Sequence, residues 1–259
     1  MNEVTATPDH ILYLEEIPST NDFLNALVQS SDSPLSNGFI VSSQYQSSGR
    51  GQVGNHWHSE KNKNLLFSLL LYPDFIKAKD QFYISKAISI AIVKTLRALF
   101  SDQSDFFKIK WPNDIYYKDS KLAGILIENL LVGEYISNTI VGIGLNVDET
   151  HFPTNLPNPI SLRMIEPEMT VGKEALLRRL RHSILLEIER LRDDAYFDQL
   201  SEQYLQMLYR YNLPSPFSDS QGEFVATIVD VHPDGKLLLQ TEKGEKRLYY
   251  FKEVEYKFK

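Results

Sequence analysis

The chain has 259 residues, enough for one large domain or for a catalytic domain with a small addition. Its 34 acidic residues outnumber its 27 basic ones, and the net charge of -7 gives it no general attraction for nucleic-acid phosphates. The absence of cysteine excludes disulfides, thiolate metal sites and a cysteine nucleophile, and it fits a reducing compartment.

Apolar periodicity and turn residues divide the first 213 residues into strands and helices. After the first strand, Ser19 or Thr20 is expected to cap a helix, because either hydroxyl can accept a hydrogen bond from the first turn. The other elements expected in chain order are strands at 11–14, 38–42 and 65–71, a helix at 82–100, strands at 106–111, 114–117, 121–128 and 135–143, a proline-rich loop at 149–160, and helices at 172–193 and 197–210.

The pattern changes at Pro214-Ser215-Pro216. Beyond it lie only short strand-like runs at 223–231, 236–241 and 246–251, and the Asp-Gly pair at 234–235 is a strong hairpin signal. We therefore expect two domains, 1–213 and 214–259, the second a small β-barrel docked on the first. Helices mixed with mostly antiparallel-looking strands favour an α+β class for the first domain.

A glycine-rich stretch from Ser48 to Trp57, SGRGQVGNHW, is the first candidate site. Its glycines let the backbone approach a ligand closely, and successive N–H groups in such a loop can bind an anion. Arg50 adds a charged donor fork for phosphate or carboxylate, and Trp57 adds a flat apolar face for a ring. Glycine-rich surface loops are common, so on spacing alone a ligand loop and an ordinary loop are equally good interpretations.

Two lysines frame a second candidate site. Lys110 begins the run Lys-Trp-Pro-Asn-Asp, in which Pro112 cannot donate to a ladder and Asn113 and Asp114 become turn residues. Lys121 opens an apolar strand and would offset the charge that builds up on a phosphate during transfer. Taken alone, a hairpin with a solvated turn is a slightly better explanation of this run.

Alternating glycines mark a third candidate in the strand at 141–147. Gly142 and Gly144 weaken this strand unless a ligand or another backbone comes close, and a bulge explains them equally well. Asn146 either donates to a phosphate or caps a turn.

The six histidines lack transition-metal spacing, and there is no Gly-x-Ser-x-Gly elbow. A Mg²⁺ ion that arrives with nucleotide phosphates needs only one or two protein oxygens, such as those of Asp114.

Taken in order, these motifs resemble the biotin–protein ligase family. They cover about residues 11–165, and although each is weak alone, five in order with consistent spacing are specific. The resemblance implies an α+β fold: a mixed-sheet catalytic domain of the biotin/lipoate ligase type with a small C-terminal SH3-like β-barrel. The matching pieces are Ser19-Thr20-Asn21, Gln46 ahead of Gly49-Arg50-Gly51 and Trp57, Lys110–Asp114, Lys121–Leu126 and Gly142–Asn146.

The resemblance also implies an ATP-dependent reaction in two steps. Biotin attacks the α-phosphate of ATP to form biotinyl-5'-AMP, and a lysine of a biotin carboxyl carrier domain then takes the biotin. ATP, Mg²⁺ and biotin are the expected ligands, and the metal has no fixed site beyond the neighbourhood of Asp114. By position, the residues implied are Ser19, Thr20, Asn21, Gln46, Arg50, Gly51, Gln52, Lys121 and Gly124 for biotin, Arg50, Trp57, Asn113 and Asn146 for the nucleotide, and Lys121, Arg50 and Asp114 for catalysis.

Two departures from the family pattern bear on function. Gln52, Val53 and Asn55 stand where many members carry further arginines, so weaker retention of the adenylate and different partners are both open. Ten residues precede Ile11, which leaves no room for the helix-turn-helix domain of the repressor members, and no DNA-binding role is expected. A monomer and a homodimer fit equally well.

Two other functions compete with this one. A lipoate– or octanoate–protein ligase shares the architecture, but the Lys110–Asp114 run favours biotin. A non-catalytic protein-binding module would leave Arg50, Lys121 and Asp114 to be explained separately. The chain shows neither an apolar run of about 18 residues nor a secretory signal, so a cytoplasmic location is expected.

Overall fold

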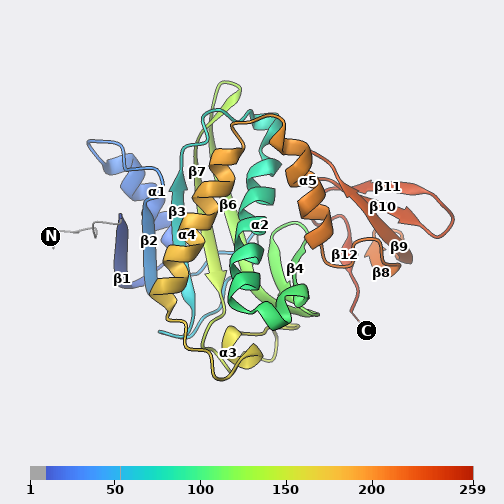
Figure 1. The fold of residues 1–259 in the computed structure, drawn as a ribbon, viewed down its shortest axis with the longest axis horizontal. Coiled ribbons are helices and arrows are strands. Elements are labelled where there is room, and N and C mark those ends of the chain that lie inside the picture. Colours follow the sequence, from blue (N-terminus) through green and yellow to red (C-terminus); the bar gives the residue numbers. More distant parts are fainter. Residues whose placement is uncertain (1–9, 53, 259) are drawn as a thin grey trace.

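A seven-stranded mixed sheet forms the body of the molecule in the computed structural model, which describes residues 10–52 and 54–258 (Figure 1). The strand order is β1-β2-β3-β7-β6-β5-β4, with β1 and β2 parallel and every other neighbouring pair antiparallel. The strands are β1 (Ile11–Ile17), β2 (Ile40–Gln46), β3 (Leu65–Leu71), β4 (Phe107–Lys110), β5 (Asp114–Tyr117), β6 (Ser120–Val132) and β7 (Tyr135–Leu145).

Side chains that alternate along the strands build a core on each face of this sheet. Ile11 and Ile40 belong to the large core, whereas their neighbours Leu12 and Val41 belong to the small one. This follows from the two-residue period of a strand, which sends successive side chains to opposite faces. Leu24 of α1 (Thr20–Ser30) completes the small core, so α1 covers that face.

Two long helices cover the other face. Figure 1 shows α2 (Phe82–Leu99) and α4 (Lys173–Arg190) side by side over the sheet, and they contact each other. The remaining helices are α3 (Leu162–Ile165), α5 (Tyr196–Met207) and the 3-10 helices η1 (Ala78–Asp80) and η2 (Ser101–Phe106). Among the described residues, none of the helices is both long and apolar enough to span a bilayer.

A second, antiparallel sheet lies beyond α5 at the C-terminal end (Figure 1). It begins at Ser215 and has the order β11-β10-β9-β8-β12. Its buried side chains join the large core of the first sheet, with Phe217 and Ile228 both fully buried. The strands are β8 (Ser215–Asp219), β9 (Gly222–Val231), β10 (Leu237–Thr241), β11 (Lys246–Tyr249) and β12 (Glu255–Tyr256).

The α+β class is confirmed, and most expected elements are present, with some strands longer and others shorter than expected. The sequence did not predict α3, which follows the proline-rich loop, the 3-10 helices η1 and η2, or the strands β8 and β12. Pro216 lies within β8, and β12 has only two residues, so neither strand has a recognisable apolar run. The cap is confirmed at Ser19, whose hydroxyl accepts from the backbone N–H of Asp22.

Candidate functional site

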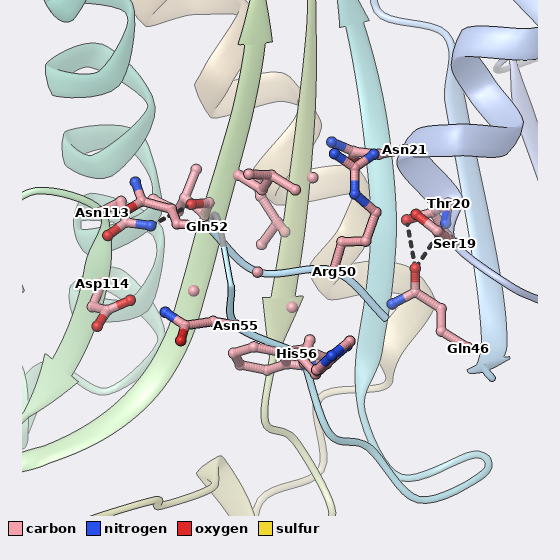
Figure 2. A pocket seen from close by; sticks show the side chains of 18 of the residues that line it. Ser19, Thr20, Asn21, Gln46, Arg50, Gln52, Asn55, His56, Asn113 and Asp114 are labelled. Atoms are coloured by element: carbon pink, nitrogen blue, oxygen red, sulfur yellow. Dashed lines mark hydrogen bonds between the residues drawn. The ribbon is translucent and has the colours of Figure 1, made fainter. Parts of the chain in front are cut away.

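The largest concentration of the expected residues lies in a pocket on the face of the sheet that carries α1. The pocket has an empty volume of about 700 Å³, including open solvent at its mouth. It is built by the start of α1, the end of β2, the loop after it, and β5, β6 and β7 (Figure 2). Its lining residues are Ser19, Thr20, Asn21, Gln46, Arg50, Gly51, Gln52, Asn55, His56, Trp57, Asn113, Asp114, Lys121, Gly124, Ile125, Leu126, Gly142, Ile143 and Gly144.

Three glycines of β6 and β7 form the floor of this pocket, which we call the main pocket. A Cβ on Gly142 would lie under 3.0 Å from the side chain of Asn21. A Cβ on Gly124 or Gly144 would meet the Trp57 indole in the same way. The alternating glycines are therefore required by the close approach of Asn21 and Trp57, because any larger residue would displace these side chains.

One end of the main pocket is a network of uncharged polar groups. The backbone N–H of Thr20 donates to Gln46 Oε1 at 2.7 Å, and Figure 2 shows the two residues facing each other beside Ser19. Ser68 of β3, fully buried, donates to Asn21 Oδ1 at 2.5 Å and lies 2.8 Å from the Thr20 hydroxyl. The sequence reading missed Ser68, although a serine inside the run Leu-Leu-Phe-Ser-Leu-Leu-Leu is itself a signal of a buried polar contact.

Arg50 lies in the loop after β2 and bridges to two carboxylates that the sequence reading also missed. Its Nη1 is ion-paired with Asp22 of α1, and its Nη2 lies 2.6 Å from Glu128 Oε1 of β6. Glu128 in turn accepts from Asn21 Nδ2 at 2.7 Å. Desolvation alone would lower the pKa of Arg50, but the hydrogen bonds and charges of Glu128 and Asp22 together raise it, so the guanidinium stays charged.

Lys121 and Asp114 form the charged end of the main pocket. Lys121 Nζ lies 2.7 Å from Asp114 Oδ1 and 5.7 Å from the centroid of the Trp57 ring. The tight turn between β4 and β5 places Asp114 opposite Gly124 in the ladder with β6. Asn113 Nδ2 donates to the Ile125 carbonyl at 2.7 Å, which ties the turn to the same strand.

Lys110 lies next to this pair with its ammonium over aromatic rings. Its Nζ lies 4.7 Å from the ring centroid of Tyr256 and 5.4 Å from that of Tyr116. Burial lowers the pKa of Lys110, and the positive charges of Lys121 and Arg210 lower it further against the raising effect of Asp114. The charged end of the main pocket and the space beside it thus hold two lysines around one carboxylate, a net positive environment suited to phosphate.

The glycine-rich loop is a small hairpin with its own backbone hydrogen bonds. Gly51 N donates to Asn55 O and Trp57 N donates to Gly49 O, both at 2.9 Å. Val53, one of the positions that departs from the family pattern, lies outside the described residues. Two buried polar atoms of the loop, Trp57 Nε1 and Gln52 Oε1, have no hydrogen-bond partner among the described residues. Unsatisfied atoms of this kind indicate a site for a polar ligand.

Asn146 is the one expected site residue outside the main pocket. Its side chain donates to the Ile160 carbonyl at 3.0 Å and lines an adjoining cavity. This cavity shares Asn55, His56, Trp57, Asp114 and Lys121 with the main pocket. The two spaces therefore adjoin each other at Lys121, whose side chain lines both.

The family model described as the biotin/lipoate A/B protein ligase family matches residues 13–146, just over half of the chain. The chain belongs to this family. The ligase/repressor BirA of Bacillus spizizenii is 28% identical over 245 residues, which cover 93% of this chain and 72% of that protein. The human biotin–protein ligase is 29% identical over 248 residues, which cover 91% of this chain and 32% of that protein.

Solved ligase structures share the fold of this family member. The biotin protein ligase of Aquifex aeolicus in complex with biotin and ATP superposes with a TM-score of 0.75 at 22% identity, and the match covers 95% of this chain and 99% of that one. The Leishmania major ligase in complex with biotinyl-5-AMP gives a TM-score of 0.57 at 22% identity, covering 95% and 100% of the two chains. The mixed-sheet ligase fold with an antiparallel C-terminal sheet is thereby confirmed.

Proposed function

We propose that this chain is an ATP-dependent biotin–protein ligase, which forms biotinyl-5'-AMP and transfers biotin to a lysine of a biotin carboxyl carrier domain. One observation carries the proposal: the main pocket joins an uncharged hydrogen-bonding end around Thr20 and Gln46 to a charged end at Lys121 and Asp114. A ligand with a polar, neutral ring at one end and a carboxylate to be activated at the other matches this division. The relatives named for biotin, ATP and biotinyl-5-AMP support it.

In the first step, a biotin carboxylate oxygen attacks the α-phosphorus of ATP, and the bond to the β-phosphate oxygen breaks to release pyrophosphate. Lys121 is proposed to bring the two anions together and to stabilise the charge that develops on the phosphoryl oxygens. The chemistry needs no covalent help from the protein, because alignment of two bound reactants already lowers the barrier by several kcal/mol. Trp57, which lies over the floor glycines beside Lys121, is proposed to pack near the adenine.

A magnesium ion fits the charged end only as a companion of ATP. No group of three or more His, Cys, Asp or Glu side chains that could hold a metal occurs among the described residues. Asp114 would provide a protein oxygen to such an ion, and phosphates and water would complete the shell that Mg²⁺ prefers. The ion would supply charge neutralisation on the phosphates.

In the second step, the neutral amine of the carrier lysine attacks the acyl carbon of the mixed anhydride, and AMP leaves with the bonding electrons. The acceptor arrives as an ammonium and must lose one proton before it attacks. Asp114 is proposed to receive this proton, because its carboxylate lies at the reacting end beside Lys121. The loop from Gly49 to Trp57 is proposed to shield the anhydride from water.

The test is a transfer assay with three acids. The protein is incubated with ATP, Mg²⁺, a purified carrier domain and either biotin, lipoate or octanoate. We expect a mass increase of the carrier with biotin alone and an adenylate of biotin that co-purifies with the enzyme. Labelling by lipoate or octanoate without biotin would assign the chain to the other branch of its family, and no adenylate with any acid would favour a non-catalytic binding module.

We also propose a domain division, a class of partner and a location for this chain. A division at 213/214 is supported by the start of the second sheet at Ser215. The net charge of -7 argues against nucleic acid as a partner. A cytoplasmic location is proposed because ATP is plentiful there and the chain has no cysteine. The roles assigned to Ser19, Asn21, Gly51, Gln52, Asn113 and Asn146 remain predictions.

A further inference from the structure

Three carboxylates lie in or beside the main pocket, and they are divided between its two ends. Asp114 pairs with Lys121 at the reacting end, whereas Asp22 and Glu128 pair with Arg50. Figure 2 shows the Arg50 side chain extending from the loop toward Asn21, on the side of Thr20 and away from Asp114. The ion-paired guanidinium therefore lies beside the uncharged network around Thr20 and Gln46, which we call the neutral end of the pocket.

Glu128 is fixed by a chain of buried polar groups. Its Oε2 accepts from Asn21 Nδ2 at 2.7 Å, and Asn21 Oδ1 accepts from the hydroxyl of Ser68 at 2.5 Å. Asn21 and Ser68 are 3% and 0% exposed, and Gly142 leaves room for the Asn21 amide. An acceptor that is already ordered binds a guanidinium with a smaller loss of side-chain entropy.

The position of Arg50 in the chain makes its side chain an effective anchor for the loop. Gly49 and Gly51 flank it, and glycine loses more backbone freedom than any other residue when a loop becomes ordered. The Arg50 backbone forms an isolated bridge with His56, one residue before Trp57. Holding the guanidinium therefore also holds the opposite side of the hairpin, including the indole that covers Gly124 and Gly144.

We propose that Asp22 and Glu128 are positioning residues of this site, which hold Arg50 as a strap across the neutral end of the main pocket. The strap orders the glycine-rich loop before a ligand binds and slows the escape of the adenylate, the second effect resting on the proposed function. Arg50 then completes the pocket wall, and the phosphate charge is left to Lys121. A single exposed ion pair contributes little, but two carboxylates on one planar guanidinium also fix its geometry.

The first experiment measures loop order in the protein without ligand. Glu128→Gln, Asp22→Asn and the double variant remove the negative charges with little change of shape. Glu134→Gln and Asp32→Asn are the matched controls, since both side chains are exposed and neither contacts Arg50. Hydrogen exchange of residues 47–57 is followed by mass spectrometry, together with acrylamide quenching of tryptophan. Trp111 is only 3% exposed, so a change in quenching reports mainly on Trp57.

We expect exchange in the double variant to be about fivefold faster than in the wild type, with the single variants between them. Quenching should rise by about twofold, because local opening of the hairpin exposes the indole. The controls should match the wild type. Arg50→Lys should resemble a single variant, because one ammonium cannot bind both carboxylates as a planar fork. Wild-type exchange and quenching in the double variant would overturn the proposal.

The second experiment measures the intermediate. After a single turnover with biotin and ATP, the double variant should release biotinyl-5'-AMP about tenfold faster than the wild type, with a first-step kcat within about twofold. A large fall in kcat with unchanged release would instead make Arg50 a phosphate ligand and overturn the strap. If the wild type forms no adenylate, the proposed function fails, and the exchange and quenching results still decide whether the strap exists.

Discussion

Lys121 shows how much one side chain can contribute to the proposed reaction. Its ammonium faces Asp114 at 2.7 Å and reaches both the main pocket and the adjoining cavity. Lys121 is a cation that lines both spaces, so removing it leaves the Asp114 carboxylate without its ion-pair partner next to the incoming phosphates. Repulsion would then replace attraction at the reacting atoms.

We therefore expect Lys121→Ala to lower the rate of adenylation by well over tenfold while the fold survives. The rate is measured by biotin-dependent exchange of pyrophosphate into ATP, and the fold by thermal unfolding. Lys61→Ala, at an exposed position outside the pocket, should keep the wild-type rate. An unchanged rate in Lys121→Ala would remove this residue from the mechanism.

The floor glycines allow a second prediction at the scale of one residue. Gly144→Ala places a Cβ against the Trp57 indole and should displace the ring, which we expect to raise the KM for ATP about tenfold. In Trp57→Ala the ring is gone, so adding Gly144→Ala should then have little further effect. A double-mutant cycle measures this coupling, and additive effects of the two substitutions would show that the ring does not act through this contact.

At the scale of elements, the start of α1 serves both the fold and the site. The Ser19 hydroxyl caps the helix by accepting from Asp22 N, and the same first turn carries Thr20 and Asn21 into the pocket. The cap thereby fixes the direction in which Asp22 leaves the helix toward Arg50.

We expect Ser19→Ala to lower the free energy of unfolding by about 1 kcal/mol, as is typical for loss of an N-cap. Urea unfolding followed by circular dichroism measures the change. Ser30→Ala, at the exposed end of the same helix, is the control and should change stability by less than about 0.5 kcal/mol. Equal effects of the two substitutions would contradict a capping role for Ser19.

The elements of the large sheet were predictable because their signals are local. Continuous apolar runs such as Leu65–Leu71 and the buried faces of α2 and α4 follow directly from neighbouring residues. The Arg50 contacts were not predictable in this way, since Asp22 and Glu128 lie 28 and 78 residues away along the chain. Nothing in a single sequence pairs these positions, and the family pattern alone pointed Arg50 toward phosphate.

At the scale of the whole molecule, a buried lysine links α2 and α5 to the second sheet. Lys86 of α2 is 1% exposed, and its Nζ donates to Ser201 of α5 at 3.0 Å and to the Val231 carbonyl of β9 at 3.3 Å. Desolvation lowers its pKa to about 8, against a smaller raising effect of Asp230. Folding therefore disfavours the charged form of this lysine.

The sign of the pH dependence follows from proton binding. Between pH 8 and about 10.5 the unfolded chain binds more protons at Lys86 than the folded chain, so stability should rise with pH in this window. Relative to Lys86→Met, which cannot titrate, the wild type should gain on the order of 2 kcal/mol in free energy of unfolding across this pH window. Chemical unfolding at several pH values measures the difference between the two proteins. If the free energy of unfolding depends on pH in the same way in both proteins, the pKa of Lys86 is not lowered by folding.

The core shared by the two sheets has a consequence for how this ligase can be handled and altered. Trp111, in the run that leads to Asn113 and Asp114, donates its Nε1 proton to the Gly235 carbonyl at 2.8 Å, between β9 and β10. The C-terminal sheet is thus a structural support for the turn that carries the reacting carboxylate. Ending the chain at residue 213 would remove the partner of Trp111 and leave that turn unsupported on one side. A minimal version of the enzyme therefore has to keep its last 46 residues, 214–259.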